Sequence, residues 1–73
     1  MTNTKNEKIH SVTINPYTKI IDALKLMDQT FRRLLLVMDN DRFVNLVSIG
    51  DIQRAIIRGI NLNEPIEKIL RKN

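Results

Sequence analysis

The sequence predicts an α+β fold, in which a three-stranded sheet carries two helices on one face and a short helix follows at the end. Three observations support this prediction. Three short segments are apolar in the alternating or continuous patterns of β-strands, and two other segments carry apolar residues at helical spacing. These segments follow one another as strand, helix, strand, strand and helix. The chain has 73 residues, which is enough for one domain at most.

The N-terminal part is expected to contain a tail and a first strand. Residues 1–8 are polar, and we expect a flexible tail there, with residues 9–73 forming the single folded unit. The segment IHSVTINP alternates at Val12 and Ile14 and stops at Pro16, which indicates a short strand. The residue before a proline avoids helical backbone angles, so the strand should end in a turn.

A helix is expected to follow this turn. Thr18 has the side chain of a helix N-cap, because its hydroxyl can accept a hydrogen bond from a free backbone N–H group. The spacing i, i+3, i+4 and i+7 is then filled by apolar residues, namely Ile20, Ala23, Leu24 and Met27. We expect the helix to end near residues 29–30.

An antiparallel hairpin is predicted next. The run RLLLVM (33–38) has no charge inside it, and its length suits a strand that is covered on both faces. The residues DNDR (39–42) favour a turn, since Asp and Asn side chains bond to their own backbone there. The run FVNLVS (43–48) is the returning strand.

The second helix begins directly after this strand. Its expected inner residues are Ile49, Ile52, Ala55 and Ile56. Gly59 stands where a helix end favours left-handed backbone. Pro65 suits the first turn of a short third helix, whose apolar face would consist of Ile66, Ile69 and Leu70.

The composition limits the possible classes of protein. With no cysteine, the chain has neither a disulfide nor a thiolate metal site. No run approaches the roughly 20 apolar residues of a membrane helix, and the polar N-terminus is unlike a signal peptide, so we expect a cytoplasmic protein without membrane contact. The net charge of +4 attracts anions, although an ordinary solvated surface is the simpler explanation. The three scattered aromatic residues argue against a platform for nucleic acid.

The junction SIGD (48–51) is the most informative segment. Ser48 and Asp51 have the spacing of a capping box, which is a sufficient explanation for the helix start. Gly50 is not required by that explanation and lowers helix propensity. A glycine there suits a site where another group approaches the backbone. The free N–H groups of a helix start bind phosphate, the Ser48 hydroxyl can add a hydrogen bond, and the Asp51 carboxylate can accept both ribose hydroxyls.

With these segments in place, the chain resembles one CBS motif, the repeat named after cystathionine β-synthase. The matching segments are VTINPYTKIIDALKLM, RLLLVMDND and FVNLVSIGDIQRAIIRG, and together with INLNEPIEKIL they cover about residues 11–70. The resemblance implies that Ser48 meets the phosphate and Asp51 the ribose of an adenine nucleotide, AMP, ADP or ATP. The segment GDIQRAIIRGINLNEPI (50–66) is most similar to CBS pairs fused to sugar-phosphate nucleotidyltransferases.

The resemblance also implies where the base would lie. It points to backbone and apolar side chains of the first two strands, which here are Ile14, Tyr17 and Leu36, and Tyr17 has a ring that can stack on a base. Arg33 stands where some members place a basic residue against phosphate. Each of these residues also has an ordinary explanation as core or solvated surface. Asn45 replaces a glycine of the family pattern and adds a side chain near the expected ligand.

No catalytic or metal-binding set is visible. His10 is the only histidine and lies next to the tail, and no Ser, His and Asp triad or glycine-rich phosphate loop is present. We therefore expect no enzyme, no metal and no required cofactor.

One layer of helices on three strands leaves apolar surface uncovered. Candidates for this surface are Leu35, Leu46, Ile57, Ile60 and Leu62. CBS motifs pair through their sheets, so the resemblance implies a homodimer or a second motif, with the nucleotide in the cleft between them. The leading hypothesis is a regulatory nucleotide-binding module of an attached or associated enzyme, such as a nucleotidyltransferase. The alternative is a structural dimerisation domain that binds no ligand.

Overall fold

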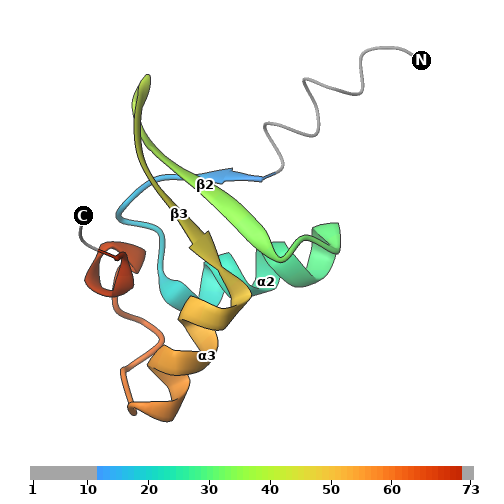
Figure 1. The fold of residues 1–73 in the computed structure, drawn as a ribbon, viewed down its shortest axis with the longest axis vertical. Coiled ribbons are helices and arrows are strands. Elements are labelled where there is room, and N and C mark those ends of the chain that lie inside the picture. Colours follow the sequence, from blue (N-terminus) through green and yellow to red (C-terminus); the bar gives the residue numbers. More distant parts are fainter. Residues whose placement is uncertain (1–11, 72–73) are drawn as a thin grey trace.

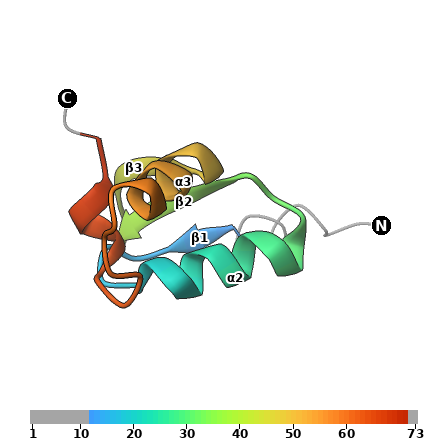
Figure 2. The ribbon, with the colours of Figure 1, turned by 90° about the horizontal axis from the view of Figure 1, so that it is seen from below.

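The computed structural model describes residues 12–71, which form a three-stranded sheet in the order β1-β2-β3 with helices packed against it (Figures 1 and 2). This confirms the predicted α+β fold. Strand β1 (Thr13–Ile14) runs parallel to β2 (Leu34–Asp39), and Thr13 stands opposite Leu36. The predicted tail at residues 1–8 and His10 lie outside the described residues.

Helix α2 (Ile20–Thr30) connects these two strands and ends where the sequence predicts. Its predicted start is wrong by one residue, because Lys19 and not Thr18 is the N-cap, and no side chain caps the helix. The Thr18 hydroxyl is used in the preceding turn, where it accepts from the Asn15 N–H at 3.3 Å. The first N–H groups of α2 instead donate to the carbonyl oxygens of Leu62 and Glu64 at 2.9 Å.

Strand β3 (Arg42–Ser48) pairs antiparallel with β2, as predicted. Asp39 stands opposite Arg42, so the turn contains two residues, and the first of these, Asn40, has a left-handed backbone with φ of 58°. Asparagine tolerates this conformation better than most residues. Figure 1 shows the hairpin turn at the end of the molecule opposite to α3.

The prediction that β2 is covered on both faces is wrong for this chain alone. Leu35 and Val37 are fully buried against the helices, whereas Leu34 is 48% exposed. Because side chains alternate across a strand, Leu34 and Leu36 belong to the opposite face of the sheet. Leu46 stands opposite Leu36 and is also exposed. The expectation that Leu35 belongs to the uncovered surface is therefore wrong, since its strand position directs it into the core.

Helix α3 (Ile49–Ile57) follows β3 without a loop. Ile52 and Ala55 are buried as predicted, but Ile56 is 49% exposed and does not belong to the inner face. Ile56 lies at the flank of the helix face that Asp51, Ile52 and Ala55 bury, so its side chain is only half covered. Gly59 follows the helix with φ of 79°, which confirms the predicted left-handed position.

The C-terminal segment completes the core. Element η1 (Ile66–Ile69) is a 3₁₀ helix, and Ile66 is fully buried. It joins one apolar cluster with residues from every other element, namely Ile14, Ile20, Ala23, Met27, Leu35, Val37, Val47 and Ile52. Within residues 12–71, no helix has the length and apolar character needed to cross a bilayer.

Candidate functional site

The start of α3 contains the predicted capping box. The Ser48 hydroxyl accepts from the Asp51 N–H at 3.2 Å, and the Ser48 N–H donates to Oδ2 of Asp51 at 2.8 Å. The hydroxyl also donates to the same carboxylate oxygen at 3.0 Å. These mutual bonds satisfy backbone groups that a helix start would otherwise leave unpaired.

Asp51 is the one buried charged residue among the described residues, with 8% of its surface exposed. Its second oxygen, Oδ1, accepts from Nη2 of Arg54 at 2.7 Å and from Nε of Arg71 at 3.1 Å. Burial by itself raises the pKa of Asp51, but the hydrogen bonds from Ser48, Arg71 and Arg54 together outweigh it and hold the pKa below its ordinary value of 3.8. The carboxylate is therefore charged and fully bonded at neutral pH.

This lowered pKa predicts a loss of stability in acid. The carboxylate contributes fully at pH values well above 3.8, and its contribution is lost as the pH falls through the lower folded-state value. The Asp51→Asn variant has no carboxylate to protonate, so it should melt at a lower temperature than the unmodified chain at neutral pH. The gap in melting temperature should narrow below about pH 3.8. Thermal unfolding followed by circular dichroism across this range checks the prediction, and a gap independent of pH contradicts it.

Arg71 reaches Asp51 because its own backbone is held beside β3. The side-chain amide of Asn45 donates to the carbonyl oxygen of Arg71 at 2.7 Å, and its own oxygen accepts from the Leu46 N–H at 2.8 Å. Asn45 was expected to add bulk near a ligand. In the structure its side chain binds the C-terminal segment. Sequence reasoning missed Arg71, because 20 residues separate it from Asp51 and no local pattern connects them.

Gly50 lies in the first turn of α3, and packing within the chain does not require it. A Cβ atom built there would meet the Ser48 hydroxyl at 3.6 Å and Nη1 of Arg54 at 3.7 Å, which are ordinary contact distances. Alanine would also favour the helix more than glycine does. The described part of the chain therefore offers no internal reason for glycine at this position.

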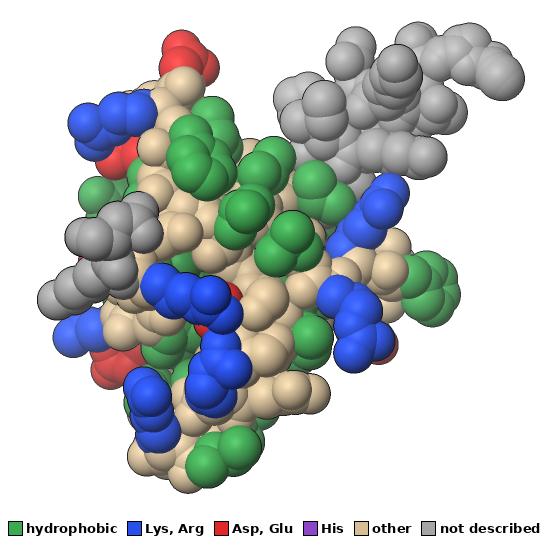
Figure 3. All heavy atoms as spheres, in the orientation of Figure 1, with side chains coloured by type: hydrophobic (Ala, Val, Ile, Leu, Met, Phe, Trp, Pro, Cys, Tyr) green, Lys and Arg blue, Asp and Glu red, His purple; other side chains and the backbone are tan. Residues whose placement is uncertain are grey.

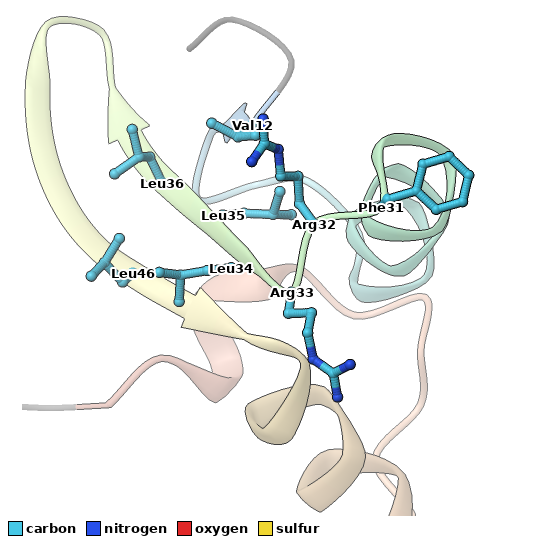
Figure 4. A pocket seen from close by; sticks show the side chains of 8 residues that line it. All are labelled: Val12, Phe31, Arg32, Arg33, Leu34, Leu35, Leu36 and Leu46. Atoms are coloured by element: carbon cyan, nitrogen blue, oxygen red, sulfur yellow. The ribbon is translucent and has the colours of Figure 1, made fainter. Parts of the chain in front are cut away.

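Two cavities lie on the uncovered side of the sheet, and the smaller of them reaches the start of α3. One, of about 280 Å³, is lined by Ser48, Asp51 and Arg71 together with Leu34, Asn45 and Leu46. The other, of about 520 Å³, shares Leu34 and Leu46 with it and extends past Leu36 and Arg33. Figure 4 shows Leu34, Leu36 and Leu46 projecting from the hairpin and Arg33 at the start of β2. The two cavities together form a surface that is apolar at one end and polar at the other.

The structure brings only some of the predicted site residues together. Leu36 and Arg33 line the larger cavity, which meets the cavity of Ser48 and Asp51 at Leu34 and Leu46. Ile14 is 9% exposed and belongs to the core cluster. Tyr17 is 67% exposed in the turn before α2 and lines none of the cavities described here. The described residues hold no group of three His, Cys, Asp or Glu side chains suited to a metal ion.

Known proteins provide a comparison for this arrangement. A family model described as the CBS domain matches residues 7–58. A mitochondrial CBS domain-containing protein of Arabidopsis thaliana is 35% identical over 46 residues, which are 63% of this chain and 22% of that protein. The chain spans about a fifth of the length of the curated relatives that it matches.

Solved structures share the fold. A cystathionine β-synthase domain protein fused to a Zn-ribbon-like domain superimposes with a TM-score of 0.78 at 22% identity, over 85% of this chain and 91% of that one. A CBS domain protein from Pyrobaculum aerophilum, complexed with AMP, gives a TM-score of 0.76 at 22% identity, over 84% of this chain and 49% of that one.

Proposed function

The chain belongs to the CBS domain family, and from this premise we propose that it is a regulatory module that binds an adenine nucleotide in a cleft formed by pairing with a second CBS motif. CBS domains are typically regulatory rather than catalytic. One observation carries the proposal. Ser48 and Asp51, at the start of α3, line a cavity together with the exposed leucines Leu34 and Leu46, and Gly50 lies in the same helical turn.

The groups that line this surface suit the three parts of a nucleotide. Leu34, Leu36 and Leu46 offer an apolar surface to a base, and Asp51 offers carboxylate oxygens to a ribose. The N–H groups of Ile49 and Asp51 already donate to the Arg33 carbonyl and the Ser48 hydroxyl, so the Gly50 N–H is the group of this first turn that can donate to a phosphate, and the Ser48 hydroxyl can join it by turning away from Asp51. The AMP complex of the Pyrobaculum aerophilum protein, which shares the fold, is consistent with such a ligand.

Ligand binding requires a rearrangement at Asp51. All the hydrogen bonds to its carboxylate come from within the chain, so a ribose has to replace one of them. Arg71 is the partner most easily displaced, because its side chain is 67% exposed, against 52% for Arg54. Its guanidinium then becomes available to a phosphate group of the same ligand.

The second motif in this proposal is another copy of the chain or a neighbouring CBS motif. Leu34 and Leu46 are 48% and 41% exposed, which leaves an apolar sheet face for a partner to cover. In a two-fold dimer this face would pack against its own copy. We propose that the regulated enzyme is an attached or associated nucleotidyltransferase, because residues 50–66 resemble CBS pairs that are fused to such enzymes. A cytoplasmic location likewise stays a prediction.

A calorimetric titration of the chain with AMP, ADP and ATP tests the nucleotide site. The decisive variant is Gly50→Ala, because its two expected effects have opposite signs. It should raise the free energy of unfolding by about 0.5–1 kcal/mol, yet lower nucleotide affinity by about tenfold through the methyl group beside the phosphate. Asp51→Asn should also lower affinity, and Asp28→Asn on the exposed side of α2 is its charge-matched control. Unchanged affinity in Gly50→Ala and Asp51→Asn would exclude this site.

The alternative is a structural dimerisation domain without a ligand. It is favoured by the complete bonding of Asp51 within the chain, because a capping box and two arginine partners explain this residue with nothing bound. Under this alternative the chain self-associates, and none of the three nucleotides binds at millimolar concentration or changes the association. The same titration, repeated at several protein concentrations, therefore separates the two functions.

A further inference from the structure

A third cavity lies on the other side of Asp51 and is strongly basic. It has a volume of about 220 Å³, and four of its lining residues are cations, namely Arg54, Arg58, Lys68 and Arg71. Asp51 is its one acidic lining residue. In Figure 3 the blue side chains gather over α3 and the C-terminal segment, below the green side chains that lie over the sheet.

The structure does not neutralise this cluster from within. Asp51 is shared by Arg54 and Arg71, and Lys68 makes only a long contact of 4.0 Å with Glu64. Within residues 12–71, the Arg58 side chain has no hydrogen bond or ion pair. The cavity therefore carries an excess of positive charge.

Helix preferences explain only part of this cluster. Cations near the end of a helix are favoured by its dipole, which accounts for Arg58 at the C-cap of α3. Arg54 and Arg58 are four residues apart, however, and like charges at this spacing repel each other. Lys68 and Arg71 come from the separate segment after Gly59 and line the same cavity. Two elements thus bring four cations to one concave surface, where a bound anion would relieve their mutual repulsion.

We propose that this cavity is a binding site for a chain of condensed phosphates, such as the tail of a nucleoside triphosphate. A linear polyphosphate carries charge along its length, as the cavity does from Arg71 and Arg54 to Arg58 and Lys68. The cavity shares Asp51 and Arg71 with the cavity proposed for the ribose, so the two sites lie on either side of these residues. The inference rests on the proposed function in one respect only, namely that a nucleoside is attached to the bound phosphate chain.

Inorganic tripolyphosphate tests the site without any nucleoside. In a magnesium-free buffer, the chain should bind tripolyphosphate at least about tenfold more tightly than orthophosphate. The double variant Arg58→Gln/Lys68→Gln should lose about tenfold in tripolyphosphate affinity. Its control is Lys25→Gln/Arg42→Gln, which removes the same charge from exposed positions on α2 and β3 and should stay within about twofold of the unmodified chain. Circular dichroism confirms that both variants fold, and Arg58→Gln alone provides a milder change.

The outcomes separate this site from the nucleotide site. Equal losses in both double variants indicate attraction by net charge alone and overturn the proposal, as does an absence of tripolyphosphate binding. If tripolyphosphate binds through Arg58 and Lys68 while AMP does not bind, the anion site stands and the proposed nucleotide function fails. If AMP binds but ATP binds no more tightly, the anion site is overturned and the nucleotide site stands. A preference for ATP that disappears only in Arg58→Gln/Lys68→Gln supports both.

Discussion

Replacing Asp51 by alanine is expected to lower the free energy of unfolding by about 2 kcal/mol. The variant loses the half of the capping box that accepts from the Ser48 N–H, and it leaves that donor unpaired. The loss of a cap costs about 1 kcal/mol, and an unsatisfied, partly buried donor adds about as much again. The ion pairs with Arg54 and Arg71 add little, because both arginine side chains are more than half exposed.

This loss is large for so small a chain. A single core in a domain of this length rarely supplies more than about 3–5 kcal/mol, so Asp51→Ala should be partly unfolded at room temperature. Urea unfolding followed by circular dichroism measures the change. Asp28→Ala is the matched control, because it removes the same group from an exposed position of α2 and should change stability by less than about 0.5 kcal/mol. Similar midpoints for the two variants would contradict this account of Asp51.

The features that were correctly predicted depend on contacts between residues close in sequence. The capping box joins Ser48 to Asp51, the hairpin closes over the turn at 39–42, and Gly59 directly follows the last helical turn. Each requires a particular residue type at a short, fixed spacing, which the sequence displays directly.

The features that were missed depend on residues far apart in sequence. Helix α2 starts directly after Lys19 because carbonyl groups more than 40 positions later in the sequence accept hydrogen bonds from the first N–H groups of the helix. Arg71 binds Asp51 because Asn45 holds its backbone. Ile56 has helical spacing that suits the core, yet it lies at the flank of the buried face of α3 and is half exposed. Periodicity identifies the apolar stripe of a helix, but it does not tell where the covering layer stops.

The same distinction applies to the candidate site. Ser48, Gly50 and Asp51 occupy one helix start because they are neighbours in the sequence, and Leu36 follows from its place on the adjoining strand. Arg54 could have been inferred as a partner of Asp51 from its spacing of three residues on a helix. Ile14 and Tyr17 lie apart from this group, and their proposed contact with a base remains a prediction for the paired form.

The uncovered sheet face is proposed as the pairing surface, and Leu46→Asp tests it. Leu46 stands opposite Leu36 and beside the cavity of Leu34, so in a sheet-to-sheet pair it would be surrounded by apolar side chains. A carboxylate buried there without a partner costs several kcal/mol. We therefore expect the dissociation constant of the homodimer to rise at least about 100-fold, with little effect on the fold, because Leu46 is already 41% exposed in one chain.

Sedimentation equilibrium over a range of protein concentrations measures this change, with Ile57→Asp as the control. Ile57 is 83% exposed in the last turn of α3, so its replacement adds the same charge at a position remote from the hairpin leucines. If dimers persist in Leu46→Asp and dissociate in Ile57→Asp, the helix end rather than the sheet is the interface, and the cleft proposed for the nucleotide would not form. If the unmodified chain is a monomer at every concentration, pairing with another copy is excluded. Only a different CBS motif could then cover Leu34, Leu36 and Leu46.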